Sequence, residues 1–263
     1  MSDWTKELFV KHPELFVGAL EERVAQASRE VDALIRMLRE QKFKTENILD
    51  LGCGIGRHSI ELGKRGTRVL GTDLSPHFIA IAKKRAEKEK VDDIVCFKAA
   101  DMREIGSAVS DRKPFDGIIS LFTSFGFYDD ETNDDVLRQC CQLVQPKGFF
   151  ALEIANRDWI IENFQERGFS RHKNVVVLQD RSFDLNTSRM NNIWSYLMQQ
   201  DDKTFTLEKQ ITLNHRLWSL HELVEMFERT GWQFQAAYSG LAQQQRDISL
   251  MEARRFLFIG KKR

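Results

Sequence analysis

The stretch Ile48-Leu-Asp-Leu-Gly-Cys-Gly-Ile-Gly56 decides the fold, and an isolated acid, Asp73, ends the next apolar run. Ile48–Leu51 is short and apolar, which predicts a buried strand. The three glycines that follow predict a turn in which a Cβ atom would obstruct a close ligand or strain the backbone. A helix is expected over 57–65, so open backbone N–H groups would point into the turn. Because Asp73 lies where an acid can accept hydrogen bonds from ribose hydroxyls, the pattern predicts a nucleotide-like ligand.

The glycine spacing narrows the ligand class. It is G-x-G-x-G, whereas dinucleotide enzymes use G-x-G-x-x-G, and Arg57 occupies the third position of that longer motif. Acids also follow the second and third expected strands, at Asp73 and at Asp101 in Lys98–Ile105. With Phe115–Ser120 as a fourth matching region, the chain resembles the class I S-adenosylmethionine (SAM)-dependent methyltransferases.

The resemblance covers roughly residues 46–156 well and 217–263 in outline. The loop Leu121-Phe-Thr-Ser-Phe-Gly-Phe-Tyr128 resembles that of small-molecule N-methyltransferases such as the amino-sugar group. The Asn-Pro-Pro-Tyr type of motif, found in methyltransferases of nucleobase or glutamine amines, is not at this position. The resemblance therefore implies a Rossmann-like fold, SAM as cofactor and S-adenosylhomocysteine as product.

Composition limits the alternatives. The 263 residues are 42% hydrophobic, enough for a sizeable core, and Lys+Arg equals Asp+Glu at 39 each. This balance gives no electrostatic indication of nucleic-acid binding. The four cysteines lack disulfide-like or metal-like spacing, the N-terminus lacks an apolar signal core, and no apolar run reaches the ~20 residues of a membrane span. We expect a cytoplasmic protein with reduced thiols and no membrane association.

Strand and helix signals alternate through the first two thirds of the chain. This alternation predicts a doubly wound, mostly parallel seven-stranded α/β sheet with right-handed crossovers. The expected strands are 46–51, 67–73, 94–99, 115–120, 149–155, 232–238 and 255–260. Helices are expected over 17–38, 57–65, 75–90 and 130–144, with another after the capping box at Ser219–Glu222.

Three further strands, 175–185, 190–199 and 204–215, are separated by short polar turns and predict an antiparallel meander inserted in the core. We expect one domain, with an N-terminal helical lid (1–45), a cofactor-binding core (46–168 and 217–263) and the insertion (169–216). The N-terminal segment either covers the cofactor or simply packs on the sheet. The insertion roofs the acceptor pocket, pairs two subunits as a homodimer, or does both.

The resemblance implies a set of cofactor-binding residues at the carboxyl ends of the strands, where open α/β sheets bind ligands. Asp73 would hold the ribose hydroxyls; as an alternative, it is an ordinary carboxylate before a helix. Asp50 would support the glycine loop or contact the SAM amino group, and Asp101 would accept from the adenine amine or be a plain turn acid. The remaining implied contacts are Gly52, Cys53 and Gly54 near the methionine part, Leu74 beside Asp73, Met102 on the adenine ring and Leu121 near the sulfonium carbon.

Three residues are candidates for the acceptor side. Tyr128 orients the acceptor or a water molecule, or is a hydrophobic lid residue. His215 and Arg216 return from the insertion toward the core, as catalytic residues or as a polar strand end. The six histidines show no metal-binding cluster, so no metal site is expected.

The sequence thus predicts a SAM-dependent methyltransferase that transfers a methyl group in line to nitrogen or oxygen of a small molecule. Three other interpretations stay open: a methyltransferase of tRNA or another macromolecule, a SAM-binding protein without transferase activity, and a nicotinamide oxidoreductase.

Overall fold

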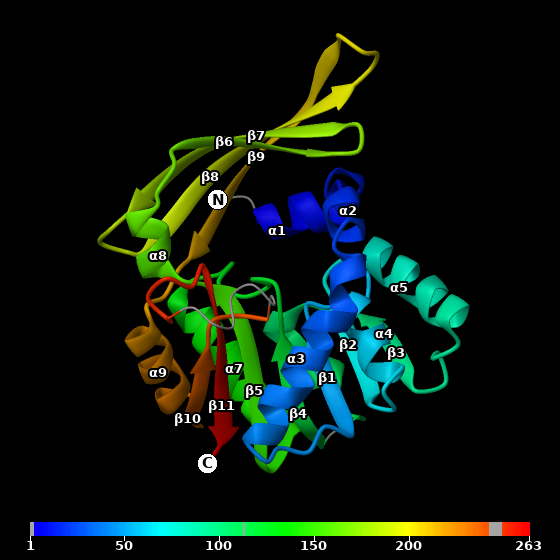
Figure 1. Ribbon diagram of the computed structural model, residues 1–263, viewed down its shortest axis with the longest axis vertical. Coiled ribbons are helices and arrows are strands. Elements are labelled where there is room, and N and C mark those ends of the chain that lie inside the picture. The colour runs from blue at the N-terminus through cyan, green and yellow to red at the C-terminus, as the bar shows by residue number, and fades with distance from the viewer. Residues whose placement is uncertain (1–2, 113, 242–248) are drawn as a thin grey trace.

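A computed structural model describes residues 3–112, 114–241 and 249–263 (Figure 1). Its larger sheet has seven strands in the order β10-β11-β5-β4-β1-β2-β3, with the last two strands of the chain antiparallel at one edge. The strands are β1 (Asn47–Leu51), β2 (Arg68–Asp73), β3 (Val95–Ala99), β4 (Phe115–Ser120), β5 (Val144–Ala155), β10 (Trp232–Tyr238) and β11 (Arg255–Lys262). The predicted fold class is confirmed.

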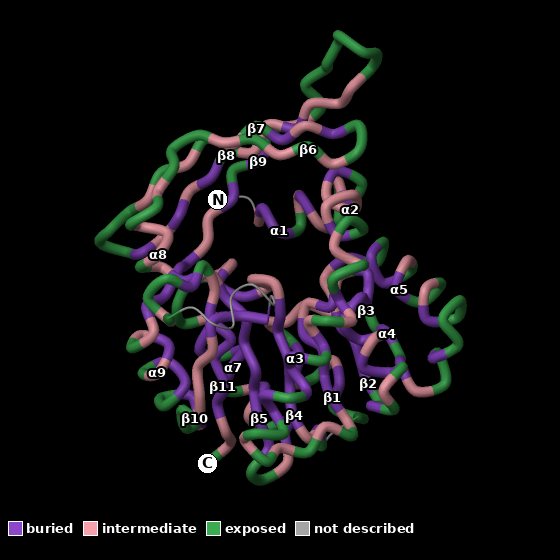
Figure 2. The backbone as a smooth tube through the Cα atoms, in the orientation of Figure 1, coloured by how far each residue is buried: buried purple, intermediate pink, exposed green. Residues whose placement is uncertain are grey.

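Helices cover both faces of this sheet because successive strand residues point to opposite sides. Ile48 belongs to the core under one set of helices, and Leu49 to the core under the other. The first set is α3 (Ala27–Glu40), α4 (Arg57–Gly63) and α5 (Pro76–Glu89). The second set is α6 (Ile105–Ala108), α7 (Asp130–Leu143) and α9 (Leu220–Arg229). Figure 2 shows the sheet strands as largely buried between these two layers.

The insertion is a second, four-stranded antiparallel sheet in the order β6-β7-β8-β9, which stands over the carboxyl ends of the parallel strands (Figure 1). Its strands are β6 (Arg167–His172), β7 (Val175–Asp184), β8 (Arg189–Gln199) and β9 (Phe205–Arg216). The inner face buries Val177, Tyr196 and Ile211 against Trp4 and Leu8 of the N-terminal segment. This segment therefore completes a small core that the insertion alone lacks.

The N-terminal segment differs from its prediction as one helix over 17–38. The chain forms α1 (Trp4–Lys6), a π-helical turn η1 (Glu7–Lys11), α2 (Glu14–Glu21), a 3₁₀ turn η2 (Val24–Gln26) and then α3. The helical apolar spacing continues through the break, but the chain changes direction there. As a result, α2 lies toward the insertion while α3 packs on the large sheet (Figure 1).

Three other features also depart from the predictions. Strand β5 begins at Val144, because Phe115 of β4 pairs with this residue across an irregularity. Residues 145–148, which the sequence places between the helix over 130–144 and the strand over 149–155, therefore lie within the strand. Strand β6 was not predicted, and its polar, alternately exposed residues explain why. A short helix, α8 (Arg157–Glu162), also follows β5.

The outer face of the insertion bears exposed apolar side chains, including Phe169 at 76% exposure and Leu207 at 57%. The predicted homodimer through the insertion stays a prediction. Light scattering can test it by measuring the molar mass of the protein in solution. Within the described residues, no helix has the length and apolar character needed to cross a membrane.

Candidate active site

The glycine loop and Asp73 meet as the sequence predicts. The N–H groups of Gly52 and Cys53 donate to the carbonyl of Thr72, at 2.8 and 2.9 Å, which joins the ends of β1 and β2. Gly52 has a φ of +78°, and a Cβ there would lie 2.7 Å from the Cβ of Ser124. Only glycine allows the loop after β4 to approach this closely.

Asp73 is held by backbone donors on both oxygens. Its Oδ2 accepts from the N–H of Gly54 at 2.8 Å, and its Oδ1 accepts from the N–H of Ser75 at 2.9 Å. The pKa of this carboxyl is raised to about 6: burial and the nearby charge of Asp50 raise it, and the two backbone hydrogen bonds oppose the rise. Each oxygen keeps a free lone pair, so the carboxylate can still accept hydrogen bonds from hydroxyl groups.

A cavity of about 130 Å³ opens at this point. Of the predicted cofactor-binding residues, the cavity is lined by Gly52, Gly54, Asp73, Leu74 and Met102. Tyr128, a predicted acceptor-side residue, lines it too. The structure therefore gathers six predicted residues, from the loops after β1, β2, β3 and β4, around one space.

The remaining lining was not predicted in detail: Thr5, Phe9, Phe16, Leu20, Phe78, Phe122, Thr123, Ser124 and Phe127. Four of these residues come from the N-terminal segment, and Phe9 packs against Phe16, Phe78 and Phe127. The N-terminal aromatics were the available signal, but their position over the loops depends on tertiary packing. The cavity is smaller than the ~300–1,000 Å³ of typical ligand pockets, because this segment closes over it.

A larger hollow of about 730 Å³ lies at the opposite edge of the sheet, near Thr45 and Thr67. It is bordered by paired surface charges such as Asp32 and Arg65. Ligands of open α/β sheets bind beyond the carboxyl ends of the strands. We therefore place the candidate active site at the smaller cavity.

Three predicted cofactor residues lie behind the cavity. Asp50 is buried, and its Oδ2 accepts from the hydroxyl of Ser59 at 2.6 Å. Cys53 packs its thiol into the core beneath the loop, where burial raises its pKa well above the usual range. Leu121 is also a core residue. These side chains support the loops that line the cavity.

The carboxylate of Asp101 forms an ion pair with the side chain of Arg103. Both carboxylate oxygens accept from Nε of Arg103 at 3.0 Å, and the same guanidinium donates to Asp3 at 3.0 Å. The guanidinium carbon of Arg103 also lies 4.5 Å from the centre of the Tyr128 ring. This arrangement ties the N-terminus to the predicted adenine side of the cavity, and Asp101 itself is not among the lining residues.

Tyr128 is a neutral phenol. Burial raises its pKa to about 12, although a hydrogen bond with Thr5 and the charge of Arg103 oppose the rise. At neutral pH the group is therefore a hydrogen-bond donor and not a base.

Glu153 fixes the loop after β4 from below. Its Oε2 accepts from the N–H of Phe122 at 3.0 Å and its Oε1 from the N–H of Leu241 at 3.2 Å, while its carbonyl accepts from the N–H of Thr123. Phe122 and Thr123 have φ values of +61° and +60°, which non-glycine residues rarely adopt. Strained backbone of this kind persists where surrounding contacts impose it, often at ligand sites.

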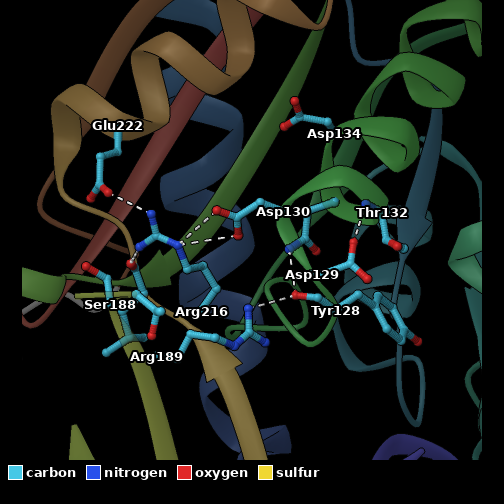
Figure 3. A network of polar contacts seen from close by, with 12 residues as sticks. Tyr128, Asp129, Asp130, Thr132, Asp134, Ser188, Arg189, Arg216 and Glu222 are labelled. Carbon is cyan, nitrogen blue, oxygen red and sulfur yellow. Dashed lines mark hydrogen bonds and ion pairs between the residues drawn. The ribbon is translucent and has the colours of Figure 1, made fainter. Parts of the chain in front are cut away.

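Arg216 joins the insertion to the core (Figure 3). Its guanidinium donates to Glu222 at 2.7 Å and pairs with Asp130 at 3.4 Å, and it also bonds the carbonyl of Leu217. These contacts occupy the side chain and are those of a structural anchor. His215, its neighbour, lies on the inner side of β9; burial lowers the pKa of its imidazole to about 4, helped by the charge of Arg189. Neither residue lines the cavity.

Comparison with known proteins agrees with this geometry. Residues 48–148 match the family described as methyltransferase domain. These residues are a methyltransferase domain. The match runs from β1 to the start of β5 and includes the glycine loop, Asp73 and the loop after β4.

The methyltransferase domain has both sequence and structural relatives. A glycine/sarcosine N-methyltransferase of Parasynechococcus marenigrum (strain WH8102) is 29% identical over 139 residues, 52% of this chain and 47% of that protein. The chain spans about half the length of the first curated relatives it matches.

Two solved structures share the fold. A SAM-dependent methyltransferase from Clostridium acetobutylicum ATCC 824 has a TM-score of 0.75 at 12% identity, covering 93% of this chain and 96% of that one. CalS10, an amino pentose methyltransferase from Micromonospora echinaspora, has a TM-score of 0.67 at 20% identity, covering 94% and 97%. At these identities the likeness establishes the fold of SAM-dependent methyltransferases, extending beyond the domain to the insertion and the N-terminal segment.

Proposed function

We propose that this protein is a SAM-dependent methyltransferase that transfers a methyl group to a nitrogen or oxygen of a small molecule. The observation that carries the proposal is the meeting of Gly54, Asp73, Leu74 and Met102 at one cavity of a methyltransferase domain. The relatives include a glycine/sarcosine N-methyltransferase and an amino pentose methyltransferase, which favours an amine acceptor.

The cavity residues fit the cofactor. Gly54 has a φ of +55°, and a Cβ there would approach Leu20 at 3.5 Å, so the bare glycine leaves room beside its N–H bond to Asp73. Asp73 would accept from the ribose hydroxyls, Leu74 and Met102 would contact the adenine, and Gly52 would border the methionine part. When bound, SAM supplies an electrophilic methyl carbon on a sulfonium.

The chain itself has to align the acceptor, exclude water and allow the acceptor atom to lose one proton. Holding a nucleophile in line at near-attack distance can supply about 7–11 kcal/mol of the barrier. Phe9, Phe16 and Phe127 line the cavity, and their apolar rings would limit the access of water to a bound acceptor. We propose that the Tyr128 hydroxyl orients the acceptor as a donor, because its raised pKa rules it out as a base near neutral pH.

The segments that cover the cavity favour a small acceptor over a macromolecule. N-terminal residues cover the site from one side, and the four-stranded sheet stands above it (Figure 1). A base flipped out of a tRNA would have to pass both the N-terminal segment and the four-stranded sheet. The cytoplasmic location expected from the sequence stays a prediction; the four cysteines are free in the structure.

Labelled methyl transfer tests the proposal. We expect the protein, incubated with methyl-labelled SAM and a metabolite extract, to label a small amine or hydroxyl compound, and Asp73→Ala to reduce the labelling strongly when SAM is subsaturating. Label confined to the RNA fraction would contradict the small-molecule assignment. Tight SAM binding without any label would indicate a SAM-binding protein without transferase activity.

A further inference from the structure

Arginine side chains from distant parts of the sequence converge on Phe122, a cavity-lining residue. The guanidinium carbons of Arg23, Arg255 and Arg57 lie 4.3, 4.5 and 5.2 Å from the centre of its ring. Arg23 follows α2, Arg57 begins α4 directly after the glycine loop, and Arg255 begins β11. These three residues form what we call the arginine cluster; the neighbouring Arg254 is exposed, and its guanidinium carbon lies 5.6 Å from the centre of the Trp159 ring instead.

The arginine cluster has too few negative partners. Glu30 pairs with Arg57 and also with His58 at 2.8 Å, but the Nη2 atom of Arg57 is buried without an acceptor. Among the described residues, no carboxylate pairs with the guanidinium groups of Arg23 and Arg255. The Glu153 carboxylate below Phe122 is engaged by backbone N–H groups.

The pKa shifts of these arginines indicate the same excess of positive charge. Burial lowers the pKa of Arg23, and the charges of Arg255, Arg57 and Arg254 lower it further, with Glu30 alone opposing among the major influences. The pKa of Arg254 is likewise lowered by burial and by Arg255. In a chain with equal numbers of acidic and basic residues, this is a local concentration of positive charge.

We propose that the arginine cluster binds an oxyanion, a carboxylate or phosphate, carried by the methyl acceptor. The inference rests on the proposed function, since it assumes that the acceptor enters the cavity that Phe122 lines. Guanidinium groups match these anions because their planar fork donates two parallel hydrogen bonds. The buried Nη2 of Arg57 lacks an acceptor, which is unfavourable in the free protein, so the site is suited to an anionic ligand.

The methionine carboxylate of SAM is the other possible source of this anion. Arg57 lies next to the loop that would border the methionine part, so one guanidinium can serve the cofactor. Arg23 and Arg255 belong to other elements, the turn after α2 and the start of β11. We therefore assign the anion that these two residues bind to the acceptor.

The test titrates inorganic phosphate and succinate calorimetrically, at low salt, into protein saturated with S-adenosylhomocysteine. We expect saturable binding of at least one of these anions. Arg23→Gln and Arg255→Gln should each weaken it about tenfold or more, as expected for a lost charge-assisted hydrogen bond. Arg112→Gln, an exposed arginine before β4, serves as the matched control and should bind like the wild type.

Two measurements identify the source of the anion. If the acceptor supplies it, both substitutions leave S-adenosylhomocysteine affinity within about twofold. The inference is overturned if anions bind only to the cofactor-free protein and the substitutions weaken S-adenosylhomocysteine but not 5′-methylthioadenosine, which lacks the carboxylate. No saturable binding, or equal binding by all variants, also overturns it. Failure of the wild type to bind S-adenosylhomocysteine would instead contradict the proposed function, and the inference with it.

Discussion

The backbone N–H of Gly54 donates to Oδ2 of Asp73 at 2.8 Å, which joins the glycine loop after β1 to the acid that ends β2. The two residues are 19 positions apart, and the parallel pairing of β1 with β2 brings them together. Asp73 is therefore fixed before any ligand arrives. Asp73 also lines the cavity, where we propose that it accepts hydrogen bonds from the ribose hydroxyls.

Asp73→Ala should weaken SAM binding by about 1.5–3 kcal/mol, the usual contribution of hydrogen bonds to a charged group. This corresponds to about 10- to 150-fold in Kd. Asp92→Ala, an exposed acid in the turn before β3, is the control and should leave Kd unchanged. Equal affinity of the Asp73→Ala variant and the wild type would remove Asp73 from the site.

The pKa of about 6 at Asp73 predicts that cofactor binding depends on pH. Hydroxyl donors favour the ionised carboxylate, so S-adenosylhomocysteine affinity should fall as pH drops below 6, by up to about tenfold per pH unit. Asp73→Asn should bind more weakly at pH 7 and lose this dependence. A wild-type Kd that stays constant from pH 7 to pH 5 would contradict the pKa assignment.

The same raised pKa predicts an effect on the free protein. Between pH 3.8 and about 6 the folded carboxyl keeps a proton that the unfolded chain has released. The contribution of Asp73 to the free energy of unfolding therefore falls as pH rises through this window, by up to about 3 kcal/mol. Urea unfolding of wild type and Asp73→Asn at pH 4 and pH 7 measures it; parallel pH profiles for the two proteins would refute it.

Glu30 should be important for stability, because it neutralises buried Arg57 and contacts His58 across the junction of α3 and α4. Removing one partner of a buried ion pair typically lowers the free energy of unfolding by about 3–5 kcal/mol. Burial raises the pKa of Glu30, but its hydrogen bond with His58 and the charges of His58 and Arg57 lower it to about 2. The stabilisation is therefore present above pH 4.5 and is lost as pH falls toward 2.

Chemical denaturation of Glu30→Ala against Glu40→Ala measures the effect of this ion pair. Glu40 lies on the same helix but is 54% exposed, with a loose contact to Arg36 at 3.9 Å. We expect a large loss of stability for the first variant and less than about 1 kcal/mol for the second. Similar midpoints for both would show that the buried pair contributes little.

The small size of the cavity predicts that the N-terminal segment moves when the cofactor enters. Phe9, Phe16 and Leu20 line the cavity, and Asp3 reaches Arg103 at 3.0 Å, so a bound cofactor would contact residues 3–21. Hydrogen exchange in this segment should slow on S-adenosylhomocysteine binding, whereas α9 should be unaffected. Unchanged exchange over 3–21 in a saturated complex would argue against a covering role.

The sequence was informative where the determinants are local. The glycine spacing, the acid after each strand and the capping box at Ser219 all depend on neighbouring residues, and each lies where it was predicted. The cavity lining was predicted only in part, since the position of Phe9 and Phe16 over the site depends on packing against the insertion.

The predicted role of Asp101 shows another limit of the sequence. Its position after β3 was predicted, but its engagement by Arg103, two residues later, could not be, because a turn acid can face either the ligand or its own neighbour. The arginine cluster was also undetectable, since its members come from residues 23, 57 and 255 and only the fold brings them together.

Calorimetric titration of the purified protein with SAM, S-adenosylhomocysteine and NAD in parallel tests the central claim most directly. We propose that Gly54 and Asp73 bind the adenosyl part of SAM, so both adenosyl ligands should bind and NAD should not. Binding of NAD alone would contradict the proposed function.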